Sequence, residues 1–447
     1  MILLEPSQRE QFVNWFRQSS AYIQAFRGKT FVLTFGGEAV REQRFADLVH
    51  DIVLLNALGI KLVIAHDALP QINERLAHAR ITLNTQKFGP IVDDLALPAF
   101  KDAAAAVRVE IEALLSMGLA NSPSAAASIR VVSGNFVIAK PLGVREGIDY
   151  RHTGEVRRID AEAIQAALSN GAIVLLSPLG YSPTGEVFSL SALEIATVTA
   201  RTLGADKLLC LTEFGNLTDD KGQLIRQLSF SEADSLIAMN PPRLAPAAAY
   251  AHLFAAVNAC RGHTVRRTHL IDRRIDGALL LELFTRDGIG TMIAADIYES
   301  IRRATIDDVG GILELIAPLE KQGVLVKRSR EQIELEIDHF YVIDRDGMII
   351  GCAALFQFTD DRTAELACLA VHGEYQHSGR GDALLRHVEH IAKQAQLRSI
   401  FLLTTHALHW FRERGFAEIE RNALPPQRLA LYNQHRNSKV LSKDLVS

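Results

Sequence analysis

The sequence predicts an α/β protein with two parts, the first of which is built on a mostly parallel sheet. Between residues 31 and 285, short apolar runs alternate with segments of helical periodicity. This alternation is typical of parallel strands whose sheet is covered by helices on both faces. Near residue 297 the pattern changes to one that contains a β-hairpin. The length of 447 residues also favours two or three domains over one.

The first part is expected to begin with a helix over residues 12–28 and to continue with the strand FVLTF (31–35), which ends at Gly36-Gly37. The stretch MNPPRLAPAAAY contains three prolines, and we expect it to be a connection that leads into a helix rather than a domain boundary. A helical pattern runs over FADLVHDIVLLNALG, and five later apolar runs are expected to be strands: 61–65, 129–133, 173–177, 207–211 and 265–271.

The second part is expected to start with a strand at 301–304 and a helix opened by Asp307-Asp308. The segment FYVIDRDGMIIGCAAL is predicted to be a hairpin, because Asp346-Gly347 supplies turn residues between two apolar runs. A buried strand over 365–371, a polar loop and a long helix follow. After these we expect a helix that ends at Gly415-Phe416 and a further strand.

Composition and charge exclude several classes of partner. The chain is 48% hydrophobic and 22% charged, with a net charge of −4 and no block of like charges, so neither a nucleic acid nor an anionic membrane is expected as its main partner. No apolar run approaches the roughly 18 residues of a transmembrane helix, and the N-terminus has no secretory signal. The four scattered cysteines form no CxxC pair, so the predicted compartment is the cytoplasm.

Two groups of polar residues are expected to be unremarkable. The short pairs Arg266-Arg267 and Arg273-Arg274 are flanked by acids and are predicted to lie on a solvated surface. The histidine pairs 387/390 and 406/409 have no third ligand at a suitable spacing, so no metal site is predicted.

The segment ELACLAVHGEYQHSGRGDALLRHVEHIAKQA (365–395) carries the clearest chemical signal. Gly379 and Gly381 have no Cβ and let the backbone approach a ligand closely. The start of the following helix offers unpaired N–H groups and a positive dipole end, which together suit a pyrophosphate. Taken alone, the loop fits a generic glycine-containing turn better than a ligand site.

The context of this loop resembles the GNAT acetyltransferases, whose signature is Q/R-x-x-G-x-G/A between a strand and a helix. Gln376 precedes Gly379-Arg380-Gly381, and the hairpin before them and WFRERGFAEI after them match the GNAT order. The resemblance implies acetyl-CoA as co-substrate and no permanently bound cofactor. It also implies that the pyrophosphate lies at the loop and the pantetheine along the preceding strand. The implied acetyl-CoA-binding residues are Cys368, Leu369, Ala370, Val371, Gln376, His377, Ser378, Gly379, Arg380, Gly381 and Asp382.

Three further segments resemble bacterial N-acetylglutamate synthases: VLVKRSREQIE (324–334), ELACLAV (365–371) and HRNSKVL (435–441). The resemblance implies transfer of an acetyl group to the amine of L-glutamate, the first step of arginine biosynthesis. A guanidinium binds a carboxylate through two parallel hydrogen bonds. Without the resemblance, a surface ion pair would be the simpler explanation of Arg328 and of Arg436. The implied glutamate-binding residues are Val326, Arg328, Cys368, Arg436 and Ser438.

Aminolysis of a thioester requires a base, because the glutamate amine is mostly protonated at neutral pH. By the resemblance, Glu365 has this role, and backbone N–H groups near Cys368 and Leu369 would hold the oxyanion. Many GNAT enzymes protonate the leaving thiolate with a tyrosine where this sequence has Phe411. Thr404 is the predicted substitute, and direct release of the thiolate is the alternative. Cys368 lacks the His/Asn partners of a nucleophile and is expected to act through its backbone.

The first part resembles the amino-acid kinase family, and acetylglutamate kinase in particular, through GIDYRHTGEVRRID (147–160) and HLIDRRIDGALLLELFTRDGIGTMI (269–293). The implied organisation is an N-terminal helix (1–27), a kinase-like three-layer sandwich (28–296) and a GNAT domain (297–447). The phosphate-handling residues depart from the kinase pattern: Thr34 replaces a lysine, Glu38 adds a negative charge, and Leu193 replaces an organising carboxylate. Phosphoryl transfer depends on positioned charge, so this domain is predicted to be inactive as a kinase.

The kinase resemblance also implies a regulatory site for L-arginine beside the N-terminal helix. The matching residues are Tyr22, His269, Glu282 and Gly288. Packing in a core would explain Tyr22 and His269 equally well. The family suggests a homo-oligomer, with a hexamer as the expected state and the N-terminal helices as contacts. Two alternative functions stay open: a bifunctional synthase and kinase, and a non-catalytic sensor of arginine and CoA.

Overall fold

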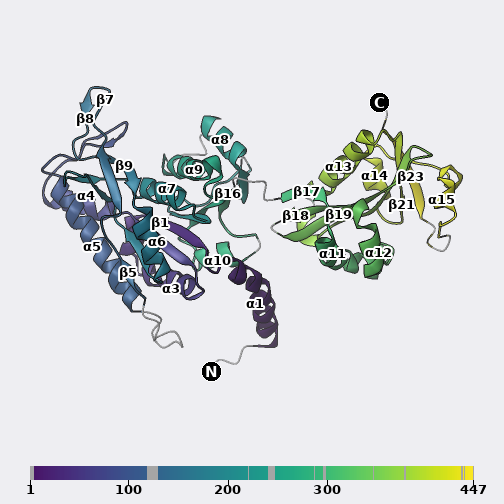
Figure 1. The fold of residues 1–447 in the computed structure, drawn as a ribbon, viewed down its shortest axis with the longest axis horizontal. Coiled ribbons are helices and arrows are strands. Elements are labelled where there is room, and N and C mark those ends of the chain that lie inside the picture. The colour runs from purple at the N-terminus through teal and green to yellow at the C-terminus, as the bar shows by residue number, and fades with distance from the viewer. Residues whose placement is uncertain are drawn as a thin grey trace. The chain divides into compact units, whose positions relative to one another are not determined.

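The computed structural model describes residues 5–117, 129–219, 221–239, 247–285, 287–294, 299–345, 347–376, 379–433, 436 and 438–445. It divides the chain into two compact units, Met1–Asp296 and Ile297–Ser447, and each is described by itself (Figure 1). Among the helices of the described residues, none combines the length and apolar character needed to cross a bilayer.

The centre of the first unit is an eight-stranded sheet in which only the pairing between β15 and β16 is antiparallel. This confirms the predicted mostly parallel α/β fold. The strand 129–133 is shorter than expected, and the strand predicted at 265–271 begins two residues later. In spatial order the strands are β14 (Gln227–Ser229), β16 (Thr291–Ala294), β15 (Arg267–Asp272), β13 (Lys207–Thr212), β1 (Thr30–Phe35), β2 (Lys61–His66), β10 (Ile173–Leu176) and β5 (Val131–Val132).

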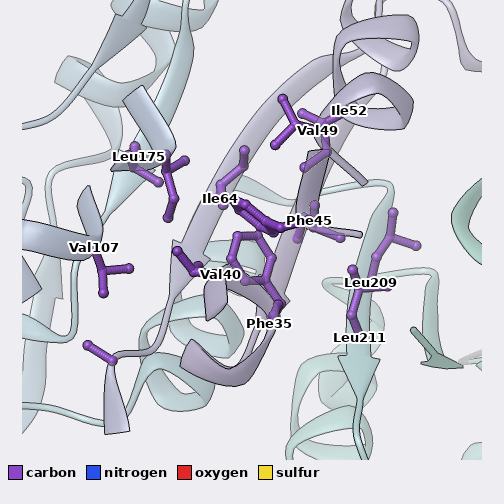
Figure 2. Close-up of a cluster of buried hydrophobic side chains, with 14 of the residues drawn as sticks. Phe35, Val40, Phe45, Val49, Ile52, Ile64, Val107, Leu175, Leu209 and Leu211 are labelled. Carbon is purple, nitrogen blue, oxygen red and sulfur yellow. The ribbon is translucent and has the colours of Figure 1, made fainter. Parts of the chain in front are cut away.

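Helices cover both faces of this sheet, and each face has its own apolar core. Phe31, Leu33 and Phe35 of β1 belong to one core, whereas Val32 belongs to the other, because successive side chains of a strand point to opposite faces. Figure 2 shows part of the first core, where Phe35 and Phe45 lie close to Ile64. The first core includes α3 (Phe45–Ala57), α5 (Leu97–Ser116) and α10 (Ala278–Phe284), and the second includes α6 (Ala161–Ser169), α7 (Ala192–Leu203) and α9 (Ala247–Cys260).

Smaller elements complete the first unit. The predicted N-terminal helix is α1 (Pro6–Phe26), which starts earlier than expected. The proline-rich connection falls mostly outside the described residues, but α9 follows it as expected. A second sheet has the order β12 (Val187–Ser189), β11 (Leu179–Tyr181), β6 (Val137–Pro141), β9 (Gly154–Ile159). The remaining elements are α2 (Gly37–Arg41), α4 (Leu69–His78), α8 (Phe230–Met239) and the hairpins β3 (Thr85–Gln86)–β4 (Gly89–Pro90) and β7 (Val144–Arg145)–β8 (Ile148–Asp149).

The second unit is a seven-stranded sheet, antiparallel except between β20 and β21. The predicted hairpin is formed by β18 and β19; its turn residue Asp346 lies outside the described residues. One face of the sheet packs against α13 (Arg380–Gln394), and the other against α11 (Val309–Lys321) and α12 (Arg330–Glu336). The strand order is β17 (Glu299–Arg303), β18 (Phe340–Arg345), β19 (Met348–Phe358), β20 (Thr363–Val371), β21 (Ser399–Thr404), β23 (Lys439–Asp444) and β22 (Ala417–Glu418).

Strand β20 changes its pairing halfway along its length. Its pairing with β21 runs from Thr363 to Glu365, and among the described residues no strand pairs with its second half on that side. On the other side, the register with β19 shifts near Cys368, whose φ of +54° lies in the left-handed region. This bulge leaves Cys368 and Leu369 outside the regular ladder. The second half of β20 therefore has backbone groups available for a ligand.

Candidate functional site

A cavity of about 660 Å³ lies beside the second half of β20. Its walls come from three segments: the end of β20, the loop that leads into α13, and the region of the short helix α14 (Leu408–Arg412). Of the predicted acetyl-CoA residues, those that line it are Leu369, Ala370, Val371, Gln376, Gly379, Arg380, Gly381 and Asp382.

Three predicted acetyl-CoA residues are not part of this wall. His377 and Ser378 lie outside the described residues. The side chain of Cys368 packs in the core beneath α11 and α12, where the Cys352 thiol donates to the Cys368 carbonyl at 3.3 Å. The side chain of Cys368 therefore faces away from the α13 side of the sheet.

The start of α13 explains the two glycines. Gly379 is the N-cap residue at φ +77°, and it has no side chain that could accept a hydrogen bond from the first N–H groups of the helix. The first N–H groups of α13 are thus available for an anion. At Gly381, a Cβ would lie 3.2 Å from Cζ2 of Trp410, so the absence of a side chain lets the indole pack against the helix.

Several wall residues were missed by sequence reasoning, among them Tyr375, Trp410 and Arg414. The Arg414 guanidinium carbon lies 3.8 Å from the Trp410 ring centroid, and the same group binds the Asp382 carboxylate at 2.5 and 3.1 Å. These contacts join α14 to the start of α13. Trp410 and Arg414 are four residues apart, but no spacing in the sequence connects them with Asp382, because the fold brings α13 and the region of α14 together.

Glu365 is 8% exposed and lies in a bidentate ion pair with Arg428. Nε of Arg428 donates to Oε2 at 2.5 Å, and Nη2 donates to Oε1 at 2.9 Å. The guanidinium fixes the orientation of the carboxylate. Arg428 belongs to α15 (Pro426–Leu429), 63 residues further along the chain, and sequence reasoning did not single it out.

Arg436 contacts the segment that follows α11, and Arg328 belongs to that segment. Nη2 of Arg436 donates to the carbonyls of Gly323 and Val324 at 2.9 and 2.8 Å. The Arg328 guanidinium lies over the rings of Phe340 and Phe356 and forms an ion pair with the Glu336 carboxylate at 2.7 Å. The predicted residue Val326 is two positions before Arg328 and is 59% exposed.

Thr404 and Ser438 lie in different surroundings. The Thr404 hydroxyl oxygen accepts from the N–H groups of Ala407 at 3.1 Å and His406 at 3.4 Å, which leaves its own O–H able to donate. Ser438 lines another cavity, of about 600 Å³, formed with residues 418–422 and 439–440. Its carbonyl accepts from the Tyr432 hydroxyl at 2.8 Å.

The first unit contains a buried cluster of alternating charge, formed by Lys207, His269 and Glu282. Nε2 of His269 lies 3.0 Å from the Lys207 ammonium, and Nδ1 lies 2.6 Å from the Glu282 carboxylate. Because an ammonium only donates, Nε2 must accept and Nδ1–H must donate. Burial, followed by the charge of Lys207, lowers the pKa of His269 to about 4. Lys207 was not among the predicted residues.

Glu282 is held on its second side by the backbone. Its Oε2 accepts from the N–H groups of Ile289 at 2.7 Å and Gly290 at 2.8 Å. Burial alone would raise the pKa of Glu282, but the hydrogen bonds from His269 and from these N–H groups lower it below its usual value. A Cβ at Gly288 would lie 2.4 Å from Oε2, so only glycine fits this turn.

Helix α1 lies against this region. The Ser19 hydroxyl donates to the Phe284 carbonyl at 3.0 Å, and Phe26 is within 5.8 Å of the Phe284 ring. Tyr22 packs against the first core and lies 6.0 Å from the Phe26 ring. The Lys207 ammonium lies 5.1 Å from the Phe26 ring centroid. The structure thus brings α1 close to the cluster of Lys207, His269 and Glu282.

Known families match both units. Residues 29–272 match the amino acid kinase family, and residues 311–416 match the GNAT acetyltransferase family. The amino-acid acetyltransferase of Pseudomonas fluorescens (strain Pf0-1) is 49% identical, covering 97% of this chain and all of its own. The Pseudomonas putida enzyme of the same description is also 49% identical, over 97% of this chain and 99% of its own. The chain belongs to the amino-acid acetyltransferase family. It is therefore an acyltransferase, as the sequence predicted.

Solved structures of one relative match as well. N-acetylglutamate synthase from Neisseria gonorrhoeae, complexed with coenzyme A and L-arginine, is 36% identical, with a TM-score of 0.88 over 98% of this chain and all of that chain. The same synthase complexed with coenzyme A and N-acetyl-glutamate gives a TM-score of 0.61 at the same identity and coverage.

In this acetyltransferase, charged residues lie together at the edge of the first sheet where β15 and β13 end. Arg273, at the end of β15, was expected to be solvated, but its side chain is only 7% exposed. It binds both Glu42 oxygens at 2.7 and 2.8 Å and also contacts Glu213. The expectation was wrong for Arg273 because the ends of parallel strands bring its two acidic partners together. Arg274, paired with Asp272, is 57% exposed as expected.

The described residues contain no group of three or more histidine, cysteine or acidic side chains that could hold a metal ion. The cysteines that the structure describes, Cys210, Cys260, Cys352 and Cys368, are all buried free thiols.

Proposed function

We propose that this acetyltransferase moves the acetyl group of acetyl-CoA to the amine of L-glutamate, the first step of arginine biosynthesis, and that L-arginine inhibits it. The observation that carries the proposal is that Arg436 contacts the segment after α11, through the carbonyls of Gly323 and Val324, and that Arg328 belongs to the same segment. Glutamate has two carboxylates, and each can be bound by a guanidinium. The related synthase that was solved with coenzyme A and N-acetyl-glutamate supports this choice of acceptor.

Acetyl-CoA is the donor, and the proposed binding site is the 660 Å³ cavity. The uncapped start of α13 suits the pyrophosphate, and the strand residues Leu369 to Val371 suit the pantetheine. The related synthase was solved with coenzyme A, which supports a coenzyme A site in this chain. All four cysteines are free thiols, which is typical of reducing compartments and supports the predicted cytoplasmic location.

The proposed reaction is direct aminolysis. Glu365 takes a proton from the substrate ammonium, directly or through a water, and the amine then attacks the thioester carbonyl. The bulge leaves Cys368 and Leu369 without a register partner in β19, and their N–H groups are the proposed donors to the oxyanion. Collapse of the tetrahedral intermediate breaks the C–S bond and forms the amide, and the second proton of the attacking nitrogen passes to the departing CoA sulfur or to water. The Thr404 O–H can donate to that sulfur, and direct release of the thiolate is the alternative.

The cluster of Lys207, His269 and Glu282 is the proposed arginine site. An α-amino acid carries an ammonium and a carboxylate, and the cluster offers one buried carboxylate and one buried ammonium on either side of a neutral histidine. Tyr22 and Gly288 complete the proposed pocket. The L-arginine complex of the related synthase supports a regulatory role for arginine. The unit that contains the site would then serve in regulation rather than in phosphoryl transfer.

The proposed assembly is a homo-oligomer, with a hexamer as the expected state and α1 as the contact. The outer half of α1 exposes large apolar side chains: Phe12, Val13, Trp15 and Phe16 are 41–56% exposed. Such a surface is more often an interface than a free face. We also keep the division into helix 1–27, kinase-like domain 28–296 and GNAT domain 297–447 as a proposal.

A thiol-release assay with acetyl-CoA and each of the twenty amino acids tests the function. We expect release with L-glutamate and little with the others. No release with any amino acid would favour a non-catalytic sensor. Incubation with ATP and N-acetylglutamate tests the bifunctional alternative, and no phosphorylated product is expected, because Thr34 and Leu193 replace the kinase residues.

A further inference from the structure

Tyr375 lies at an unusual position in the wall of the cavity. It is only 4% exposed, although it belongs to the short segment between β20 and α13. Two guanidinium carbons lie near its ring centroid: that of Arg345 at 4.9 Å and that of Arg380 at 5.2 Å. Arg345 ends β18, and Arg380 is the first residue of α13. One aromatic ring thus contacts cations from two separate elements.

The two arginines differ in their relation to the cavity. Arg380 and Tyr375 line it, whereas Arg345 does not. A guanidinium over an aromatic ring is attracted by the ring's quadrupole and loses freedom of movement. A guanidinium packed over a ring has fewer rotamers available than one that is solvated on all sides. The ring therefore restrains Arg380 beside the uncapped N–H groups of α13.

We propose that Tyr375 is a positioning residue that holds the Arg380 guanidinium against the pyrophosphate of acetyl-CoA, with Arg345 stacked on the same ring. This inference rests on the proposed binding of acetyl-CoA in the cavity. An oriented guanidinium adds charge-assisted hydrogen bonds to a phosphate that the helix N–H groups already bind. A pre-positioned side chain also loses less entropy when the donor binds. The part that depends on Tyr375 is thus the affinity for CoA, not the chemical step.

Tyr375→Leu and Tyr375→Phe form the matched pair for the test. Phenylalanine keeps the ring and loses only the hydroxyl, whereas leucine removes the ring. Tyr375→Leu is expected to raise the KM for acetyl-CoA and the Kd for CoA by about tenfold, with kcat and the KM for glutamate within about twofold. Tyr375→Phe is expected to stay within about twofold of the native values. A Tyr375→Phe change as damaging as Tyr375→Leu would overturn the proposal.

Non-additivity separates positioning from simple packing. Arg380→Ala should raise the Kd for CoA by about tenfold or more, and the double change Tyr375→Leu/Arg380→Ala should be no worse than Arg380→Ala alone. Effects that multiply would mean that the ring acts independently of Arg380, and the proposal would fall. If Tyr375→Leu does not fold, Arg345→Ala takes its place. It should weaken CoA binding by about threefold in the native background and not at all in the Arg380→Ala background.

A comparison of two acetyl donors shows which phosphate of the coenzyme Arg380 binds. Acetyl-dephospho-CoA keeps the pyrophosphate and lacks the 3′-phosphate. The loss caused by Arg380→Ala should be the same with both donors, and a loss confined to acetyl-CoA would assign Arg380 to the 3′-phosphate and overturn the proposal. The Kd for CoA is measured by calorimetry without an amino acid. A failure of glutamate as acceptor therefore leaves this test intact.

Discussion

The buried pair of Glu365 and Arg428 makes the sharpest prediction about catalysis, because stability and turnover should respond to it differently. Glu365→Gln removes the proposed base and keeps the shape of the side chain. We expect kcat to fall by roughly 10²–10⁴-fold, the usual range for loss of a general base. Binding of acetyl-CoA should be retained, since Glu365 does not line the 660 Å³ cavity.

The stability effect follows from the burial of the pair. The Glu365 side chain is 11% exposed and that of Arg428 is 20% exposed, so neither charge is well solvated. Arg428→Met leaves a buried carboxylate without its cation, which typically costs about 3–5 kcal/mol. At about 2–4 °C per kcal/mol, the unfolding midpoint of the second unit should fall by roughly 10 °C. In Glu365→Gln/Arg428→Met both charges are gone, and much of this stability should return.

Calorimetry and the thiol-release assay then separate the two roles. The double variant should be nearly as stable as the native enzyme and as inactive as Glu365→Gln. If turnover returned together with stability, Glu365 would be a structural anchor for α15 rather than a base. Near-native turnover of Glu365→Gln at neutral pH would remove it from the mechanism altogether.

Three further predictions concern the substrate, the effector and pH. Arg328→Ala and Arg436→Ala should each raise the glutamate concentration for half-saturation about 10- to 100-fold, which corresponds to about 1.5–3 kcal/mol for a charge-assisted hydrogen bond, with the KM for acetyl-CoA little changed. Glu282→Gln should raise the arginine concentration needed for inhibition and spare the uninhibited rate, since arginine acts through a coupling of about 1–3 kcal/mol between two sites. Stability of the first unit should show a net fall between pH 7 and pH 5, because the effect of two buried histidines exceeds the opposite effect of Asp51, whose pKa is raised by burial to about 6. Burial lowers the pKa of His66 to about 4, and burial and the charge of Lys207 lower that of His269 to about 4. Between these values and the ordinary pKa, both histidines bind a proton in the unfolded chain but not in the folded state. The contribution of each histidine to stability is complete above the ordinary histidine pKa of about 6.5 and is lost as the pH falls towards 4. The loss at pH 5 is about 2 kcal/mol per histidine, and urea unfolding measures it.

Each of these predictions has an outcome that contradicts it. Unchanged glutamate saturation in both arginine variants would mean that the acceptor binds elsewhere. If arginine changes neither the activity nor the thermal stability of the native enzyme, the regulatory site is wrong as a whole. Equal inhibition after Glu282→Gln would refute only its placement. A flat stability profile between pH 7 and pH 5 would show that the buried histidines take up protons in the folded state.

Local pattern was sufficient to predict the elements and their class. Apolar runs and helical periods depend on neighbouring residues, so the parallel sheet, the hairpin of β18 and β19 and the glycine loop before α13 could be found in the sequence. The strands of the second sheet in the first unit were missed, since they are short and partly exposed: β9, for example, has mostly intermediate or exposed side chains. β11 and β12 have three residues each, which is too short for an alternation of apolar and polar side chains to be recognised.

The sequence by itself determined the chemical types at the proposed sites: a glycine loop for a phosphate, arginines for carboxylates, and one acid for a base. Only the tertiary structure decided which partners these groups have. Arg428 meets Glu365 across 63 residues, Lys207 meets His269 across 62, and Arg273 is buried between Glu42 and Glu213. Such pairings depend on which strand ends and helix ends become neighbours, and long-range contacts of this kind have no period in the chain. A charged side chain looks the same in sequence whether it is solvated or buried, and the difference is set by what the fold packs around it.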